Sequence, residues 1–264
     1  MEGIAGLLGL SQGRFLYGLL LFVRFTGLFT LSPIFGRRNF PTVARIGLSL
    51  CLAYLLLAAN PDGTVDSFNL WQYALLVVKE LLIGLTMGYM ATLFLSVATM
   101  AGQIIDVQVG FGMAQLYDPE TSNLVSLASS LLNYCMLLLF LAANGHHTLI
   151  RMLALTVQWL PVGQVGLDAA VVDAVVDAFT VAFSMAVTLS LPVLAAELVL
   201  EVIMGIMIRA VPQMNIFVVG IPVKLAVGLL AMLTMVPFFV GYGDTVFEAM
   251  FHHMSTALKG MIPA

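Results

Sequence analysis

Residues 174–208 read AVVDAFTVAFSMAVTLSLPVLAAELVLEVIMGIMI, a largely apolar run whose only charged residues are three acids. A helix of this length, rising about 1.5 Å per residue, would extend roughly 50 Å. The apolar core of a bilayer is only about 30 Å thick. Pro192 lies near the middle of the run, which predicts a kinked or broken helix. The run therefore indicates a helical membrane protein with unusually long elements.

The composition of the whole chain supports the same class. Of the 264 residues, 61% are hydrophobic and only 9% are charged, whereas soluble domains carry roughly 25% charged residues. The net charge is −4, and no basic cluster suits nucleic acid. The chain is predicted to be an integral membrane protein.

Five further apolar stretches have lengths near that of a membrane span. Leu, Ala, Met and Val dominate them without sustained alternation, which favours helices over barrel strands. We therefore expect an all-α, polytopic membrane protein of long kinked helices and helical hairpins. The five stretches are 14–35, 42–59, 70–101, 124–143 and 216–240.

A polar, glycine-rich stretch, GQIIDVQVGFGMAQLYDPETSN at 102–123, lies between two of these apolar runs. Irregular backbone survives at membrane depth only where it is buried in protein or lines water. The stretch is therefore either a pore loop that dips back between the spans or an ordinary connecting loop outside the membrane.

Two other segments combine apolar and charged residues. Residues 161–178 carry three aspartates among Val and Ala and suit an amphipathic or interfacial segment. Residues 244–259 suit a separate amphipathic helix near the end of the sequence.

Several ionisable residues fall within or at the ends of the predicted spans, where charge is costly and usually faces a cavity or a partner. Glu197 and Glu201 are four residues apart and share one helical face. Lys79, Arg209 or Lys224 are the cations that could pair with them. Three interpretations remain open: a proton or ion relay, structural pairing within or between subunits, and snorkelling to an interface. The charges concerned are Arg24, Lys79, Glu80, Glu197, Glu201 and Lys224.

Signals for an enzyme are weak. GYGD at 241–244 and the pair Tyr117-Asp118 resemble fragments of intramembrane aspartyl proteases, but Asp118 is followed by the loop-like PETSN. The histidine pairs at 146–147 and 252–253 are adjacent, and adjacent residues do not share a helix face. No GxxxxGK[ST] occurs. We expect no catalytic residue, no metal site and no cofactor. A stand-alone secondary transporter is the main alternative to a subunit that works within a larger assembly.

Four islands in order along the chain resemble one family. They are RFTGLFTLSPIFGRRNFP at 24–41, AGQIIDVQVGFGMAQLYDPETSN at 101–123, FLAANGHHTLI at 140–150 and RAVPQMNIFVVGIPVK at 209–224. Together they resemble the R-subunit family of the bacterial flagellar type III protein-export gate, which is homologous to the T subunits of injectisome export gates. The NGHH element and the DP loop favour the flagellar branch.

This resemblance implies a role in a larger machine. One R subunit would assemble with five P and four Q subunits into a helical export gate, with the export proteins A and B (FlhA and FlhB) around it. The gate would pass unfolded flagellar proteins across the bacterial inner membrane, in the flagellar basal body. Residues 1–160 would form a P-like portion of the single membrane domain, and residues 161–264 a Q-like helical hairpin.

The resemblance also assigns roles to residues. The family's plug loop, which seals the channel, maps onto about 106–123 and includes Gly110, Phe111, Gly112, Met113, Leu116, Tyr117, Asp118 and Pro119. Bulky apolar side chains can block ions by dewetting, and the glycines give the backbone freedom to bend. A second island acts as an architectural turn for subunit packing, in which Pro212 and Pro222 limit helix propagation. Its members are Pro212, Gln213, Asn215, Pro222 and Lys224.

Overall fold

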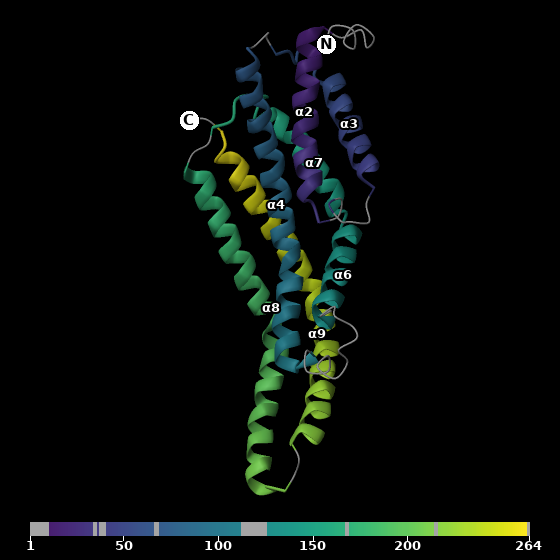
Figure 1. Cartoon of the computed structure of the whole chain (residues 1–264), viewed down its shortest axis with the longest axis vertical. Coiled ribbons are helices and arrows are strands. Elements are labelled where there is room, and N and C mark those ends of the chain that lie inside the picture. The colour runs from purple at the N-terminus through teal and green to yellow at the C-terminus, as the bar shows by residue number, and fades with distance from the viewer. Residues whose placement is uncertain are drawn as a thin grey trace. The chain divides into compact units, whose positions relative to one another are not determined.

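The computed structural model describes residues 11–33, 36, 41–65, 69–111, 126–166, 169–213 and 216–262. These residues form seven helices and no strand, so the prediction of an all-α protein is confirmed (Figure 1). The helices are α2 (Gln12–Leu31), α3 (Thr42–Ala59), α4 (Leu70–Val109), α6 (Leu127–Ala142), α7 (Gly145–Trp159), α8 (Ala169–Ala210) and α9 (Ile216–Lys259).

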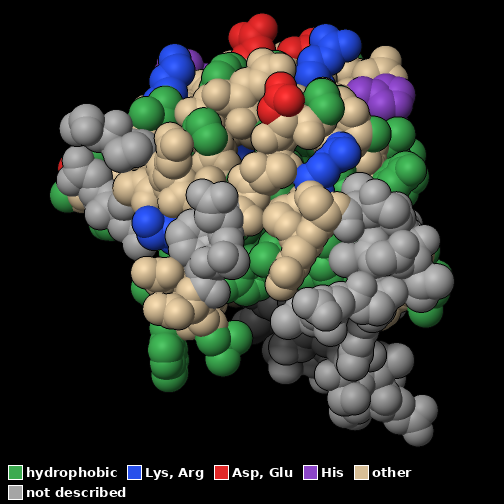
Figure 2. All heavy atoms as spheres, turned by 90° about the horizontal axis from the view of Figure 1, so that it is seen from above, with side chains coloured by type: hydrophobic (Ala, Val, Ile, Leu, Met, Phe, Trp, Pro, Cys, Tyr) green, Lys and Arg blue, Asp and Glu red, His purple; other side chains and the backbone are tan. Residues whose placement is uncertain are grey.

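The helices have the length and apolarity of membrane spans. Five of them, α2, α3, α4, α8 and α9, are long and apolar enough to cross a bilayer, and α6 with α7 would make a sixth span if they cross together. Large apolar side chains also remain exposed on several helices. In the end view of Figure 2, hydrophobic side chains (green) are visible beside the charged ones. The protein is a polytopic membrane protein.

Three helices extend further than the sequence predicted. Helix α4 continues to Val109, so the prediction of irregular structure from residue 102 is wrong for 102–109. Helix α8 has 42 residues and passes through Pro192 without a break. Helix α9 has 44 residues and absorbs 244–259, which is therefore no separate helix. A proline costs a helix one backbone hydrogen bond, a loss that long apolar helices tolerate when neighbouring groups compensate.

The described helices form two compact units. The first contains residues 1–93, 144–178 and 250–264, and the second contains residues 94–143 and 179–249. Three helices, α4, α8 and α9, are divided between the units. One part of each helix belongs to the first unit and the other part to the second.

Glycines allow the helices of the first unit to approach closely. A Cβ atom built on Gly84 of α4 would lie 2.1 Å from the Arg24 carbonyl oxygen and 3.0 Å from the Cα atom of Gly27, both on α2. The backbones of α2 and α4 are therefore in direct contact at this crossing. Helix α3 packs along α2, where Gly18 lies against Leu57.

The second unit contains a helical hairpin and a second close crossing. Helix α8 ends at Ala210, and after a turn the chain continues into α9, which runs back alongside α8 (Figure 1). Where α4 crosses α6, a Cβ atom on Gly102 would lie 2.2 Å from the Cα atom of Ser129. Phe140 of α6 and Phe247 of α9 pack edge to face, with ring centroids 5.3 Å apart.

Replacing Gly84 with alanine is expected to force α2 and α4 apart and to destabilise the protein by about 1–3 kcal/mol. Gly47→Ala is the matched control, because nothing lies within 4 Å of a Cβ atom at that helical glycine. The control is expected to be neutral or slightly stabilising, since alanine favours helix by roughly 1 kcal/mol over glycine. Thermal unfolding in detergent measures both. Equal midpoints for the two variants would contradict the crossing.

Candidate functional site

The first unit contains a buried ion pair that joins three helices. The Arg24 Nε atom of α2 donates to the Glu80 carboxylate of α4 at 2.6 Å, and both side chains are fully buried. Arg24 also donates through Nη1 to the Thr156 hydroxyl of α7 at 3.1 Å and through Nη2 to the Leu160 carbonyl at 3.1 Å. A guanidinium satisfied on three sides in this way is fixed in position.

The other oxygen of the Glu80 carboxylate has its own partner. The backbone N–H of Gly163 donates to Oε1 at 2.9 Å. Gly163 has a positive φ of 88°, a conformation that favours glycine and allows the turn after α7 to present its N–H to the carboxylate. The network thus fixes this turn as well as the helices, and its charges are saturated by protein groups.

The second unit contains two carboxylates and one ammonium. Lys224 of α9 pairs with Glu201 of α8 at 2.6 Å, so one of the three cations offered by the sequence is the partner. Gln108 of α4 donates to the same Glu201 oxygen at 3.3 Å. This pair is partly exposed, and pairs of that kind contribute only about 0–1 kcal/mol. Its main effect is to link α8 and α9 to the C-terminal end of α4.

Glu197, one turn before Glu201, lies in a different environment. It is fully buried, and neither of its carboxylate oxygens has a hydrogen-bond partner among the described residues. Gly228 of α9 faces it, because a Cβ atom built there would lie 3.0 Å from the Oε1 atom of Glu197. A buried, unpaired carboxylate is costly in its ionised form.

Asp106 of α4 binds the first turn of α6. Its carboxylate accepts hydrogen bonds from the backbone N–H groups of Ala128 at 2.9 Å and Ser129 at 3.1 Å, and from the Ser126 hydroxyl. A carboxylate at a helix N-terminus satisfies exposed N–H groups and interacts favourably with the helix dipole. Asp106 therefore holds the start of α6 beside the end of α4.

Only part of the predicted plug can be placed. Helix α4 ends at Val109, and Gly110 follows with a positive φ of 83°, its N–H donating to the Asp106 carbonyl at 3.1 Å. Phe111 is half-buried. The remaining plug residues lie outside the described residues, and they are Gly112, Met113, Leu116, Tyr117, Asp118 and Pro119.

The predicted packing island is split between a turn and a helix. Pro212 and Gln213 are exposed in the turn after α8, and Asn215 lies outside the described residues. Pro222 lies inside α9, so the expectation that it limits helix propagation is wrong. Pro222 falls in the second turn of α9. A proline has no N–H to donate, and the carbonyl that would otherwise accept this hydrogen bond lies close to the start of the helix.

The residues that resembled an enzyme do not form one site in the described part of the chain. Asp244 is an exposed residue of α9, and Asp118 lies outside the described residues. Among the residues that the structure describes, no three His, Cys, Asp or Glu side chains converge as metal ligands. His253 lies 3.5 Å from Asp177, which links the C-terminal part of α9 to the first part of α8. Lys79, predicted as an intramembrane charge, is half-buried on α4.

Two of these arrangements were not predicted from the sequence. Arg24 is 56 residues from Glu80 and 132 from Thr156, so no local pattern could have paired them. Asp106 stood out only as an acid in a polar stretch, and its role at α6 depends on partners 20 or more residues away. The one local signal is Ser126, whose residue type is favoured just before a helix.

The fold and these sites define a class of protein. The chain is a multi-pass helical membrane protein in which the buried charges of Arg24, Glu80 and Asp106 are matched by side chains and backbone groups of the same chain.

Comparison with known proteins gives the family. Residues 15–250 match the family described as "Bacterial export proteins, family 1", and the chain belongs to this family. It is 32% identical to the flagellar biosynthetic protein FliR of Bacillus subtilis (strain 168), over 81% of this chain and 84% of that protein. It is 29% identical to FliR of Escherichia coli (strain K12) over 90% of each chain. The Yop proteins translocation protein T of Yersinia pestis is 31% identical over 79% of this chain and 81% of that protein.

The family match confirms the resemblance that was based on the four sequence islands. A bacterial export protein with at least five apolar spans is a multi-pass component of the inner membrane. Similarity to both FliR and a type III translocation protein makes the chain a type III export component of the flagellar kind.

Arg24→Met is expected to destabilise the protein by roughly 3–5 kcal/mol, because it leaves the Glu80 carboxylate buried without its charge partner. The double variant Arg24→Met, Glu80→Leu is expected to be more stable than Arg24→Met alone, since no unpaired charge remains. Lys79→Met, on the same helix, is the control and should cost less than about 1 kcal/mol. Unfolding in mixed micelles measures all three. A double variant that is no more stable than Arg24→Met would contradict this account.

Proposed function

We propose that the chain is a structural, channel-forming subunit of the flagellar type III protein-export gate, through which unfolded flagellar proteins cross the inner membrane. The observation that carries this proposal is the family match over residues 15–250. The FliR-named relatives and the translocation protein T support a gate common to flagella and injectisomes. The subunit would act by assembly and not by catalysis.

The exposed apolar faces support assembly with other subunits. The membrane-span portion of α4 is 61% buried within the chain, whereas those of α8 and α9 are each only 17% buried. Helices α8 and α9 thus offer large apolar surfaces that either lipid or protein can cover. We propose that P and Q subunits cover them, in the family's ratio of five P and four Q to one R, with the export proteins A and B bordering the assembly.

The division into a P-like portion at 1–160 and a Q-like hairpin at 161–264 stays a prediction. Within the second unit, the parts of α8 and α9 run antiparallel to each other, which is compatible with a hairpin (Figure 1). The turn around Pro212 and Gln213 is exposed in the isolated chain, as a contact for neighbouring subunits would be. Their role in subunit packing is part of the proposal.

We further propose that the segment after Gly110 seals the channel. A constriction lined by Met, Leu and aromatic side chains excludes water and therefore blocks ions. The flexibility of methionine lets such a seal adapt to many different unfolded sequences as they pass. The hydrogen bond between Ser126 and Asp106 holds the residues on either side of the segment close together. The end of α4 and the start of α6 therefore lie side by side.

A stand-alone secondary transporter is the alternative, and Glu197 is the observation that favours it. Buried ionisable residues in membrane helices often mark ion pathways. Transport of a small solute by the purified chain alone, in vesicles without any partner subunit, would support this alternative and contradict the gate.

Deleting residues 110–117 is expected to make the assembled gate permeable to small ions, because the apolar seal is lost. A length-preserving variant, Met113→Ser with Leu116→Ser and Tyr117→Ser, is expected to leak in the same way. It replaces the deletion in the test when the deleted protein does not assemble. The control is Leu70→Ser with Trp71→Ser, two side chains that are 80% and 83% exposed at the start of α4.

Conductance of the purified gate in planar bilayers measures the leak. Assembly of each variant is checked first by purification from membranes. A gate that is fully assembled and stays impermeable with either plug variant would rule out the proposed seal.

A further inference from the structure

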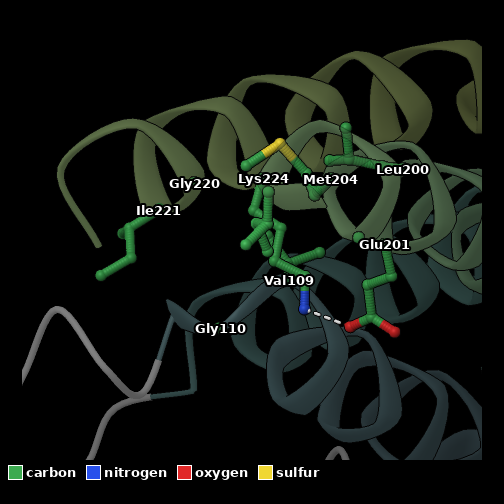
Figure 3. A pocket seen from close by; sticks show the side chains of 10 residues that line it. Val109, Gly110, Leu200, Glu201, Met204, Gly220, Ile221 and Lys224 are labelled. Atoms are coloured by element: carbon green, nitrogen blue, oxygen red, sulfur yellow. Dashed lines mark hydrogen bonds and ion pairs between the residues drawn. The ribbon is translucent and has the colours of Figure 1, made fainter. Parts of the chain in front are cut away.

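Two acids and one lysine lie close together in the second unit, where α8 packs against α9. Glu201 pairs with Lys224 at 2.6 Å, and Gln108 of α4 donates to the same Glu201 oxygen. This pair borders a mostly apolar pocket of about 360 Å³ that is lined by residues of α4, α8 and α9 (Figure 3). Glu197, one turn earlier on α8, is the second acid, and it has no hydrogen-bond partner in the described part of the chain.

The two acids face α9 at matching positions. Glu201 lies opposite Lys224, and Glu197 lies opposite Gly228, one turn further along α9. A Cβ atom at Gly228 would be 3.0 Å from the Glu197 Oε1 atom, and glycine leaves that space open. Successive turns are about 5.4 Å apart, a distance that the flexible stem of a lysine covers by changing rotamer. Lys224 is therefore within reach of either carboxylate.

The charges around Glu197 do not balance when both acids are ionised. The charged groups that act on Glu197 are Lys224 of α9 and Glu201 of its own helix. Asp106, at this end of α4, is bound to the start of α6. Arg209 lies about 18 Å further along α8 at the usual helical rise. One ammonium thus faces two carboxylates, and in the structure it pairs with Glu201.

The surroundings of Glu197 favour its neutral form. Its side chain is fully buried, and the methyl groups of Val109 lie against the same position of Gly228 that Glu197 faces. A buried carboxyl group without a partner takes up a proton, because the unpaired charge is too costly. Glu80 is equally buried but is paired with Arg24, so its charge is compensated. The partner, and not burial alone, separates these two glutamates.

We propose that Glu197 is a proton-binding site, and that its proton and the ammonium of Lys224 exclude each other. While Glu197 is protonated, Lys224 pairs with Glu201, as the structure shows. When Glu197 releases its proton to water, Lys224 turns to the new carboxylate. Glu201, whose side chain is 47% exposed, then keeps Gln108 as its donor. Proton binding at Glu197 thereby controls the ion pair that joins α8 to α9. This inference does not depend on the chain forming a channel.

Infrared difference spectroscopy of the full complex in membranes tests the proton directly, because a protonated carboxyl group has a carbonyl stretch that a carboxylate lacks. At neutral pH, Glu197→Gln is expected to remove one such band from the spectrum. Glu248→Gln is the matched control, since Glu248 is an exposed glutamate of α9, and it should leave the band in place. A spectrum that Glu197→Gln does not change in this region overturns the proposal.

The exclusion between proton and lysine is tested with Glu197 left intact. Glu201→Gln frees Lys224 to pair with Glu197, so the band is expected to be lost. Adding Lys224→Met to Glu201→Gln removes the cation, and the band should return. Lys224→Met alone should keep it. A band that persists in Glu201→Gln is the result for a buried acid that does not exchange partners, and it overturns the proposal.

These variants also cover the case in which Glu197→Gln does not assemble. They change only the partly exposed pair, whose side chains are 24% and 47% exposed, so the buried packing around Glu197 is kept. The spectra report on one carboxyl group, whereas the native mass of the complex and its conductance report on assembly and on the seal. The proton site and the proposed gate can therefore fail independently.

Discussion

The buried pair of Arg24 and Glu80 is the interaction on which the rest of the first unit depends. Removing two charges from water costs several kcal/mol for each ion, and an ion pair offsets this only when the remaining donors and acceptors are also satisfied. Here the guanidinium binds Thr156 and the Leu160 carbonyl, and the carboxylate binds the Gly163 N–H. Helices α2, α4 and α7 and the following turn must therefore all be in place together. Because every charge is saturated by protein groups, the network is suited to architecture and not to proton transfer.

In the second unit, polar side chains are likewise satisfied by groups of neighbouring helices, but the partners differ. Asp106 takes its hydrogen bonds from the N-terminus of α6, and Glu201 takes its from Lys224 and Gln108. In each case a polar side chain of one helix is matched by the end or face of another. Polar groups inside an apolar helical protein thus specify which helices meet, while apolar surface alone would not. Glu197 departs from this rule among the described residues, since its buried carboxylate has no partner there.

Composition and apolar runs were enough to predict the helical, polytopic fold, because these signals are local. The family could also be predicted, since the islands at 24–41, 101–123 and 209–224 are specific. Helix boundaries were harder. Residues 102–109 looked like a loop because Asp106 is polar, and only the distant α6 explains why it lies in a helix. The partners of Arg24 depend likewise on tertiary contacts, and Pro192 and Pro222 show that long apolar helices override the usual local preference of proline.

The central claim is that the chain works as one part of an export gate and not alone. The native mass and subunit composition of the complex, purified from membranes in mild detergent, test this most directly. The account predicts a large assembly that contains one copy of this chain with several copies of P- and Q-type subunits. A chain that purifies by itself, from membranes in which P and Q subunits are present, would contradict it.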